Sequence, residues 1–409
     1  MSYSYRNGVL HAEEVALDEL ARRFGTPCYV YSRAAIESAY GEFARALRGR
    51  DSMICYSVKA NSNLAVLALL AGLGSGFDIV SGGELSRVIA AGGDPGKALF
   101  SGVGKSEAEI EFSLEKGIGC INVESEAELE RLDRVARRIG RRAPVALRVN
   151  PDIDPKTHPY ISTGLRENKF GVAHGEAERL YRRAARLPAI EIVGIGCHIG
   201  SLLTEAGPFV AAVERLVELV ERLEKLGIAL KHIDVGGGIG IRYRDETPDP
   251  IAAFVAGTLA ALGPRPQTVV FDPGRSIVGN AGALLTRVEY VKPGFLVVDA
   301  AMNDLIRPAL YGAWHEVRTV RESVPGDAVY DIVGPVCESA DFLAKGRRLA
   351  AAEGDLLAVL SAGAYGMSMS SNYNSRPRVP EVLVDGSSAH LVRRRESVDE
   401  LFAHESIPA

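Results

Sequence analysis

The chain has 409 residues, of which 47% are hydrophobic, 24% charged and 7% aromatic, a composition that excludes a disordered, fibrous or low-complexity chain. Its 47 basic and 52 acidic residues give a formal net charge of −5, and no basic face is evident, so we expect no nucleic-acid partner. The length exceeds one ordinary core and predicts two domains.

The cysteines are odd in number, widely spaced and without metal-ligand spacing; they are Cys28, Cys55, Cys120, Cys197 and Cys337. No signal peptide or long apolar span accompanies them. This pattern predicts a protein of the reducing cytoplasm, with no bound metal and no membrane partner.

The first predicted elements are a helix over 15–24, closed by Gly25, and a strand over 28–31. After them, short apolar runs alternate with amphipathic helical patterns. The eight runs are 53–56, 77–80, 98–100, 120–123, 145–149, 192–197, 232–235 and 268–271. Alternating strands and helices imply parallel pairing, so the sequence predicts an α/β fold with a closed (β/α)₈ TIM-like barrel. A doubly wound open sheet is the alternative.

Beyond Ser276 the helical pattern thins and strand-like runs dominate. These runs are 283–291, 295–298, 328–333, 356–360 and 379–384. They predict a second, mostly β domain. We expect the barrel to occupy 35–276, and the β-rich domain to combine 1–34 with 277–409.

Chemistry in such a barrel gathers at the carboxyl ends of the strands. Lys59 follows the first run, His198 closes the sixth, and Gly236, Gly237 and Gly238 follow the seventh. Asp272, Gly274 and Arg275 follow the eighth. A lysine at a buried strand end is expected to sit in a partly dry place that favours its neutral, nucleophilic amine.

Two glycine motifs resemble nucleotide-binding loops but depart from them. In Gly102-Val103-Gly104-Lys105-Ser106, Leu99 stands where a P-loop requires glycine, so an ATP site is rejected. After the triplet at 236–238, Ile241 replaces the last glycine of a dinucleotide-binding motif. That triplet is instead suited to bringing backbone N–H groups close to a phosphate, or it is a plain tight turn.

The remaining candidates each have a structural alternative in packing, a turn or surface charge. His198 and Ser201 could face a planar cofactor and its phosphate, and Asp272 could keep a heterocyclic nitrogen protonated. Further along the chain lie Arg307, Tyr311, Cys337, Glu338 and Tyr365. An arginine suits a substrate carboxylate, and a cysteine beside a glutamate offers a proton donor.

Taken together, these motifs resemble the diaminopimelate decarboxylase family, pyridoxal-phosphate enzymes of the alanine-racemase-like barrel group. The resemblance spans nearly the whole chain. It rests on Tyr56-x-x-Lys59-Ala60-Asn61, Ser81-Gly82-Gly83-Glu84, Thr163-Gly164-Leu165 with Asn168-Lys169-Phe170-Gly171, His198-x-Gly200-Ser201, the glycine triplet, Pro273-Gly274-Arg275, Cys337-Glu338 and Ser361-Ala362-Gly363-Ala364-Tyr365.

The resemblance implies decarboxylation of meso-2,6-diaminopimelate to L-lysine, the last step of lysine biosynthesis, by a homodimer with shared active sites. Lys59 would carry pyridoxal 5'-phosphate, His198 would stack on its ring, and Cys337 of the partner subunit would supply a proton. The phosphate would be held by Ser201, Gly236, Gly237, Gly238 and Gly274. Substrate would be bound by Arg275, Arg307, Tyr311, Glu338 and Tyr365, of which Arg275 and Tyr365 would also contact the cofactor.

One position departs from the family pattern, because the Pro-Gly-Arg turn begins with Asp272 instead of glutamate. The acid is retained but is one methylene shorter, which puts its direct contact with the ring nitrogen in question. Two other functions are compatible with the motifs: decarboxylation of another basic amino acid or polyamine precursor, and a catalytically silent cofactor-binding relative. A racemase would be expected to lack the pair Cys337-Glu338.

Overall fold

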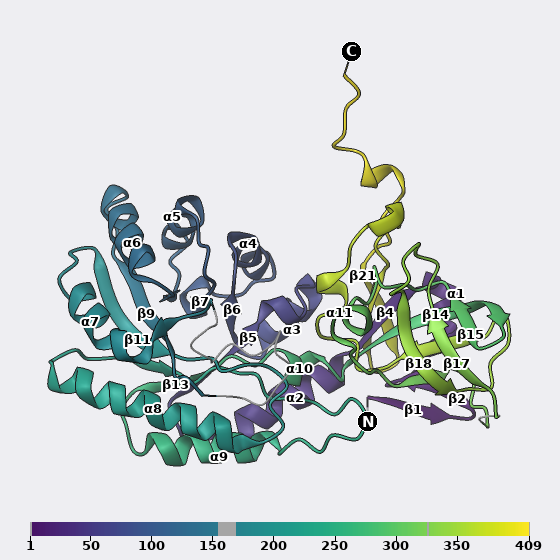
Figure 1. The fold of residues 1–409 in the computed structure, drawn as a ribbon, viewed down its shortest axis with the longest axis horizontal. Helices are drawn as coiled ribbons and strands as arrows, with labels where there is room; N and C mark the ends of the chain where they lie inside the picture. Colours follow the sequence, from purple (N-terminus) through teal and green to yellow (C-terminus); the bar gives the residue numbers. More distant parts are fainter. Residues whose placement is uncertain (1, 154–168, 325–326, 409) are drawn as a thin grey trace. The chain divides into compact units, whose positions relative to one another are not determined.

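The computed structural model describes residues 2–153, 169–324 and 327–408, and Figure 1 traces the chain through them. The motif residues Thr163, Gly164, Leu165 and Asn168 lie outside the described residues. The chain divides into two compact units. The barrel unit comprises Ala39–Ile241 and Thr247–Ser276, and the β-rich unit comprises Met1–Ser38, Arg242–Glu246 and Ile277–Ala409. The domain limits drawn from the sequence stay a prediction.

In the described part of the barrel unit, eight parallel strands pair side by side and close on themselves. They are β5 (Ser52–Ser57), β6 (Gly76–Ile79), β7 (Ala98–Phe100), β8 (Cys120–Val123), β9 (Ala143–Asn150), β11 (Ile190–Gly196), β12 (His232–Asp234) and β13 (Thr268–Phe271). Each coincides with one of the eight predicted runs, and their closure confirms the barrel over the open sheet. The short β10 (Val172–Ala173) adds to β9.

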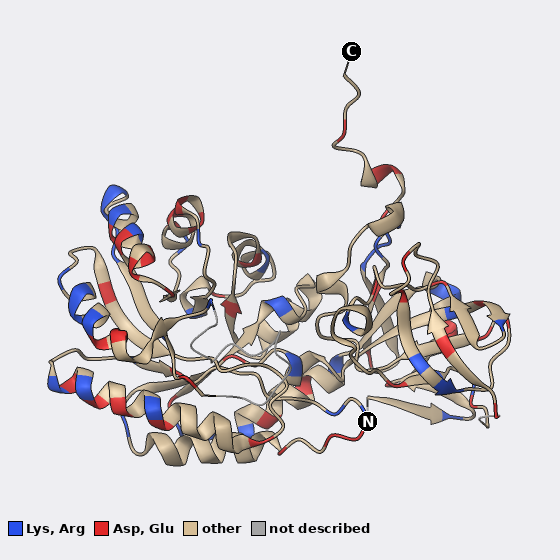
Figure 2. Ribbon diagram, in the orientation of Figure 1, with Lys and Arg blue, Asp and Glu red and all other residues tan. Residues whose placement is uncertain are grey.

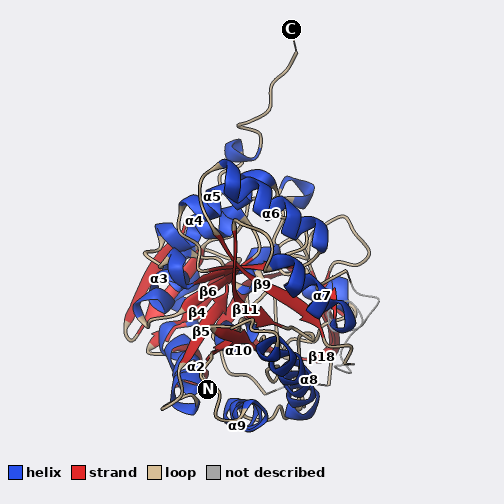
Figure 3. Ribbon diagram, turned by 90° about the vertical axis from the view of Figure 1, so that its left-hand side faces the viewer, coloured by secondary structure: helices blue, strands red, loops and turns tan. Residues whose placement is uncertain are grey.

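Helices surround these strands, as Figure 3 shows. They are α2 (Arg33–Ala46), α3 (Leu64–Gly72), α4 (Gly82–Ala90), α5 (Glu107–Glu115), α6 (Glu126–Arg138), α7 (His174–Ala184), α8 (Ala206–Lys225) and α9 (Ile251–Leu262). Helices α6, α7 and α8 carry interspersed charges of both signs (Figure 2), joined by exposed ion pairs such as Arg179 with Glu126, whereas α3 and α9 contain no charged residue. The strands are therefore covered on their outer face and buried on both.

In three successive strand-to-helix turns, a serine side chain caps the N-terminus of the helix. Ser81, Ser106 and Ser125 each accept a hydrogen bond from the backbone N–H three residues later, which belongs to Glu84, Glu109 and Glu128. A serine N-cap satisfies an N–H group that the helix itself cannot pair. Helices α4 and α6 therefore begin within three residues of the strand before them, whereas α5 begins after the loop that contains Gly102 and Lys105.

The β-rich unit combines both ends of the chain in one sheet of order β18-β17-β15-β14-β4-β20-β21. Its strands are β4 (Cys28–Ser32), β14 (Gly282–Lys292), β15 (Phe295–Val298), β17 (Val329–Val333), β18 (Phe342–Arg348), β20 (Glu381–Asp385) and β21 (Ser388–Arg393). Strand β4 pairs with β14 on one side and with β20 on the other. The N-terminal segment is thus built into a sheet made of C-terminal strands.

Smaller elements complete this unit. They are β1 (Tyr3–Arg6), β2 (Val9–Ala12), β3 (Val15–Ala16), α1 (Leu17–Phe24), α11 (Arg307–Tyr311), β16 (Val317–Thr319) and β19 (Leu356–Val359). Strand β19 pairs with both β14 and β16. The buried apolar residues Leu10, Leu20, Val30, Leu285 and Val382 belong to one core cluster of this unit. The mostly β second domain expected from the sequence is confirmed.

A single hydroxyl supports the one irregular junction between β9 and β11. Their register shifts between Ile192 and Gly194. The fully buried Tyr181 of α7 donates to the Gly194 carbonyl at 2.8 Å and accepts from the Leu147 N–H at 3.2 Å. Backbone groups beside a bulge lack part of their ladder pairing, and this hydroxyl supplies the missing partners.

We expect Tyr181→Phe to lower the free energy of unfolding by roughly 1–3 kcal/mol, because two buried backbone groups lose a hydrogen-bond partner while the ring stays packed. Urea denaturation followed by tryptophan fluorescence and circular dichroism measures the loss. Tyr290→Phe removes a hydroxyl from a side chain that is 60% exposed and should leave the transition unchanged. Equal transitions for the two variants would show that the Tyr181 hydroxyl does not support the bulge.

Candidate active site

A cavity of about 360 Å³ opens within the barrel unit at the carboxyl ends of the strands. All eight barrel strands contribute a lining residue from their last positions or from the loop that follows. The lining residues are Lys59, Asp78, Val80, Ser101, Gly102, Val103, Asn122, Arg148, Lys169, Phe170, Gly196, Cys197, His198, Asp234 and Asp272. Three of the predicted site residues, Lys59, His198 and Asp272, therefore meet in one cavity.

Lys59 lies in a short turn of helix, Val58–Ala60, directly after β5. Its Nζ lies 2.8 Å from Oδ2 of Asp78, a fully buried residue in the middle of β6. Burial would raise the pKa of Asp78, but the Lys59 ammonium and hydrogen bonds from Lys59, Ser101 and Ser57 hold it below its usual value. The pair favours the charged lysine, so the environment differs from the dry one expected from the sequence. A buried carboxylate in β6 is the reason.

His198 follows β11, and its Nδ1 accepts a hydrogen bond from the Gly237 N–H at 3.4 Å. Burial, together with the charges of Arg148 and Lys59, lowers the pKa of His198 to about 3. The imidazole is therefore neutral at physiological pH. A neutral ring fixed by a backbone N–H can present its flat face to a planar group without charge repulsion.

Asp272 follows β13, and its Oδ1 lies 3.6 Å from Nδ1 of His198. This oxygen is buried and has no hydrogen-bond partner among the described residues. Burial, together with the negative charge of Asp78, raises the pKa of Asp272 to about 8. An unpartnered buried carboxyl oxygen fits a heterocyclic N–H, because that donor would satisfy the oxygen and stabilise its charged form. The acid present here fits pyridoxal phosphate.

A second buried carboxyl group, Asp234, ends β12 and was not expected from the sequence. Its Oδ1 accepts the Gly236 N–H at 3.0 Å. Burial and the nearby Asp272 raise its pKa well above the usual range. The residue therefore anchors the start of the glycine triplet and adds a further acid to the cavity.

The glycine triplet packs so closely that side chains are excluded. Gly238 has φ +86°, and a Cβ there would lie 1.9 Å from the Gly200 carbonyl oxygen. A Cβ on Gly237 would lie 2.4 Å from the Asp272 carbonyl oxygen. Such a turn is restricted to glycine by backbone geometry and by its neighbours. It leaves a stretch of bare backbone next to the cavity residues His198 and Asp272.

Arg275 begins the short helix α10 (Arg275–Val278) and is buried. Its Nη2 donates to Oγ of Ser201 at 3.2 Å. Gly274 lies against Ser57, whose Cβ would be 3.0 Å from a Cβ on the glycine. The structure thus brings Ser201, predicted to hold the phosphate, together with Arg275, predicted to contact substrate and cofactor, and both roles stay predictions.

The other predicted site residues lie in the β-rich unit. Arg307 is buried on α11, where its guanidinium stacks over the Tyr243 ring at 4.7 Å and contacts Nε2 of His315 at 2.8 Å. Tyr311 ends the same helix. Cys337 and Glu338 are exposed neighbours on one loop, and Tyr365 adopts a left-handed φ of 57°. Their roles toward substrate and cofactor also stay predictions.

The sequence did not single out several polar residues of the cavity. These are Asp78, Ser101, Asn122, Arg148 and Asp234. Asp78 and Asn122 each lie within a wholly buried strand of otherwise apolar residues, and Asp234 ends the three-residue strand β12. A polar residue in a short apolar run that precedes a helix was the available signal, because such a side chain must find partners inside the barrel.

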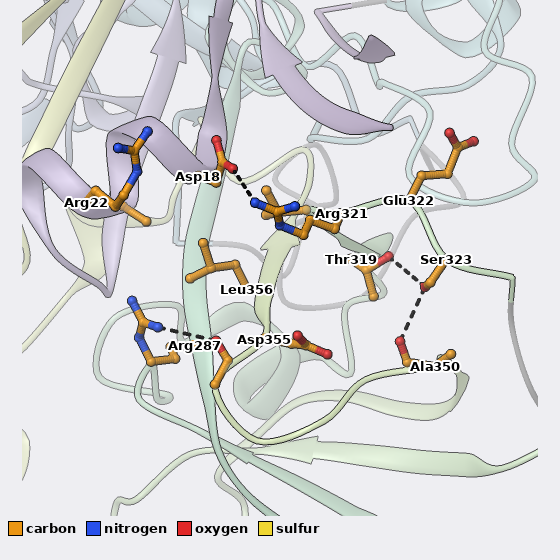
Figure 4. A pocket seen from close by; sticks show the side chains of 13 residues that line it. Asp18, Arg22, Arg287, Thr319, Arg321, Glu322, Ser323, Ala350, Asp355 and Leu356 are labelled. Atoms are coloured by element: carbon orange, nitrogen blue, oxygen red, sulfur yellow. Dashed lines mark hydrogen bonds and ion pairs between the residues drawn. The ribbon is translucent and has the colours of Figure 1, made fainter. Parts of the chain in front are cut away.

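A second cavity, of about 300 Å³, lies within the β-rich unit and contains none of the predicted site residues. Figure 4 shows Arg321 reaching toward Asp18, with which it pairs at 3.3 Å. Arg22, Arg287 and Arg321 are matched there by Asp18, Glu322 and Asp355. The lining carries no excess charge that would select an ion.

A membrane span and a metal site are two further possibilities for the described ranges. No described helix is both long and apolar enough to cross a membrane. Within the same residues no group of three or more His, Cys, Asp or Glu side chains is placed to hold a metal ion. The five cysteines are all free, four of them buried and Cys337 exposed.

Known proteins define the class to which this cavity belongs. Residues 33–279 match the family described as pyridoxal-dependent decarboxylase, pyridoxal binding domain. Over 410 residues the chain is 60% identical to a diaminopimelate decarboxylase of Pseudomonas aeruginosa, with 99% of each chain covered. It is 54% identical to that of Vibrio cholerae, covering 98% of this chain and 97% of the relative.

Solved structures agree. The diaminopimelate decarboxylase of Helicobacter pylori, complexed with L-lysine, superposes with a TM-score of 0.93 at 43% identity, covering 95% of this chain and 99% of that one. The structure described as diaminopimelate decarboxylase from M. jannaschii in co-complex with L-lysine gives a TM-score of 0.95 at 35% identity, covering 100% of this chain and 98% of that one. The chain belongs to the diaminopimelate decarboxylase family of pyridoxal-dependent decarboxylases. It is accordingly a pyridoxal-phosphate-dependent lyase.

The raised pKa of Asp272 predicts a pH dependence of stability. Between an unfolded pKa of about 4 and the folded value of about 8, the folded chain binds the extra proton. Stability without cofactor should therefore fall as pH rises through this window, by up to about 1 kcal/mol per pH unit from this group. Asp272→Asn, which mimics the neutral acid, should remove that part of the slope.

Urea denaturation of the two proteins without cofactor, at pH 5, 6, 7 and 8, measures the difference. The stability of Asp272→Asn relative to the parent should rise across the series. A constant difference would show that Asp272 is ionised throughout and is not held as a neutral acid. Asp245→Asn, at a side chain 84% exposed, is the matched control.

Proposed function

We propose that this chain decarboxylates meso-2,6-diaminopimelate to L-lysine and carbon dioxide, the last step of lysine biosynthesis. The observation that carries the proposal is the meeting of Lys59, His198 and the unpartnered Oδ1 of Asp272 in one cavity. An amine, a neutral flat ring and a buried acid are what a pyridoxal-phosphate decarboxylase requires. The names of the full-length relatives support the substrate.

Pyridoxal phosphate, when bound, accepts the electron pair left on the substrate carbon as carbon dioxide departs. Lys59 would attach it, and Ser201, Gly236, Gly237, Gly238, Gly274, Arg275 and Tyr365 would hold it. Asp272 would hold a proton on its ring nitrogen, and His198 would support the ring face. Asp272 is buried, so its charge would act there with little screening.

For substrate, we propose contacts from Arg275, Arg307, Tyr311, Glu338 and Tyr365. A guanidinium suits a carboxylate because its paired N–H donors match both oxygens. The Sγ of Cys337 would donate the proton that replaces the lost carboxyl group. Because Cys337 is exposed, it is accessible to a second copy of the chain. We therefore propose a homodimer in which each site uses the partner subunit's Cys337.

We propose a cytoplasmic location, supported by five unpaired cysteines in the described chain. A catalytically silent relative would not need the paired Lys59 and Asp78 at the base of the cavity. Decarboxylation of another basic amino acid would use the same cofactor residues. Only substrate assays distinguish this activity from the proposed one.

The purified chain with pyridoxal phosphate should release carbon dioxide from meso-diaminopimelate at a rate at least about 100-fold above that from ornithine or arginine. Lys59→Ala should lose turnover by about 1,000-fold or more, because the amine that attaches cofactor and releases product is gone. Lys231→Ala, at an exposed lysine, is the matched control. Preferred release from ornithine or arginine would overturn the substrate, and an active Lys59→Ala would overturn the mechanism.

Cys337→Ala should lower kcat by about 10- to 1,000-fold with little change in KM, because a proton donor acts after binding. Mixing Lys59→Ala with Cys337→Ala subunits should restore about a quarter of the parent's activity if each site draws on two chains. Cys337→Ser replaces the thiol with a hydroxyl and tests whether this weaker proton donor suffices. Failure of the mixture to recover activity would place both residues of a site in one chain.

A further inference from the structure

The lysine of the rejected nucleotide-binding motif, Lys105, is almost wholly buried, with its side chain 1% exposed. It lies between β7 and α5, next to the N-cap Ser106. Its Nζ makes three bonds of 2.7 Å, to the Gly102 carbonyl, the Asn122 carbonyl and Oε1 of Glu128. An ammonium has three N–H donors, so all of them are used within the protein. Lys105 is committed to the fold and is not available to a nucleotide phosphate.

The three partners of Lys105 come from separate segments: the loop after β7, strand β8 and helix α6. Two of them, Gly102 and Asn122, line the cavity. A cation that binds their carbonyls fixes the ends of β7 and β8 to each other. Removing it would leave two carbonyls and a buried carboxylate without their donor, and such groups then rearrange to find others.

A chain of side-chain hydrogen bonds runs from this point to Lys59. The Asn122 amide donates to Oγ of Ser101 at 3.1 Å, and Ser101 donates to Oδ1 of Asp78 at 2.7 Å. Oδ2 of Asp78 lies 2.8 Å from Nζ of Lys59. By holding the backbone of Asn122, Lys105 therefore positions the amide that bonds to Ser101, and Ser101 is the donor to the far oxygen of Asp78.

A second branch leads to Arg148. Oε2 of Glu128 accepts the Glu124 N–H at 2.8 Å. The Glu124 carboxylate accepts the N–H groups of Gly102 and Gly171 and pairs with Arg148 at 3.3 Å. Lys105, Glu128, Glu124 and Arg148 thus form a charge-balanced, largely buried group of four that ends at the cavity wall.

We propose that Lys105 is a positioning residue for Lys59, acting through Asn122, Ser101 and Asp78. The bonds that Lys105 makes support the Ser101 donor to Oδ1 of Asp78, so that Asp78 stays an anion whose Oδ2 is paired with the Lys59 ammonium. Loss of Lys105 releases this support and leaves more of Lys59 as the free amine. The inference rests on the proposed role of Lys59, but its test measures the amine directly.

The test is competitive acetylation of the full chain without cofactor, using limiting acetic anhydride at pH 8 and mass spectrometry of the peptide that carries Lys59. In Lys105→Met, labelling of Lys59 relative to the exposed Lys231 should rise by roughly three- to tenfold. Ser101→Ala breaks the same chain without removing a charge and should raise labelling in the same direction. Lys97→Met, which alters a lysine outside the group of four, should leave it unchanged.

The double variant Lys105→Met/Glu128→Gln separates positioning from stability. It removes both buried charges and retains an acceptor for the Glu124 N–H, so its thermal transition should recover toward that of the parent. Labelling of Lys59 should nevertheless stay high, because the Gly102 and Asn122 carbonyls still lack the Lys105 donor.

Parent-like labelling in a double variant that has regained stability would overturn the proposal and leave Lys105 with a structural role only. Unchanged labelling in Ser101→Ala would overturn it as well, even where Lys105→Met does not fold. Because no readout requires turnover, failure of the decarboxylase assignment would leave these outcomes intact and distinguishable.

Discussion

The closure of eight parallel strands is the constraint on which the site depends. Because parallel strands all point the same way, closing them brings every carboxyl end to one rim, and each strand supplies a side chain to a single cavity. Residues as distant in the chain as Lys59 and Asp272 become neighbours through the pairing of β5 with β13. The rim is formed by the strand ends together with the loops that follow them.

Within that cavity, local donors decide the charge of each buried acid. Asp78 has the Lys59 ammonium and two serine hydroxyls, and its pKa is lowered despite complete burial. Asp272 has an oxygen without a partner among the described residues, and its pKa is raised. One small cavity therefore holds a fixed anion and an acid whose raised pKa a positively charged donor would lower. Asp78, the fixed anion, orients the Lys59 amine, and the charge of Asp272 responds to the group that binds.

The sequence predicted the barrel because strands buried on both faces read as continuous apolar runs, and their turns carry glycine or polar residues. It predicted Lys59, His198 and Asp272 because each follows such a run. It missed Asp78, since one polar residue in a four-residue strand has no periodicity and its partner is set only by barrel closure. It could not place Lys105 Nζ, whose partners come from three segments. The place of β4 between β14 and β20 depends on pairing across more than 200 residues.

The shorter acid at position 272 is held by its backbone more than by its side chain. The Asp272 N–H donates to the Gly236 carbonyl at 3.1 Å, and its carbonyl accepts Oγ of Ser57 at 3.0 Å. A turn fixed on both sides cannot easily move inward to extend the reach of the carboxyl group. The carboxyl already lies against Gly237, where a Cβ would come within 2.5 Å of Oδ1. Bare backbone at Gly237 is therefore what admits the Asp272 carboxyl to the cavity wall, and a longer side chain would have to project past it toward the centre.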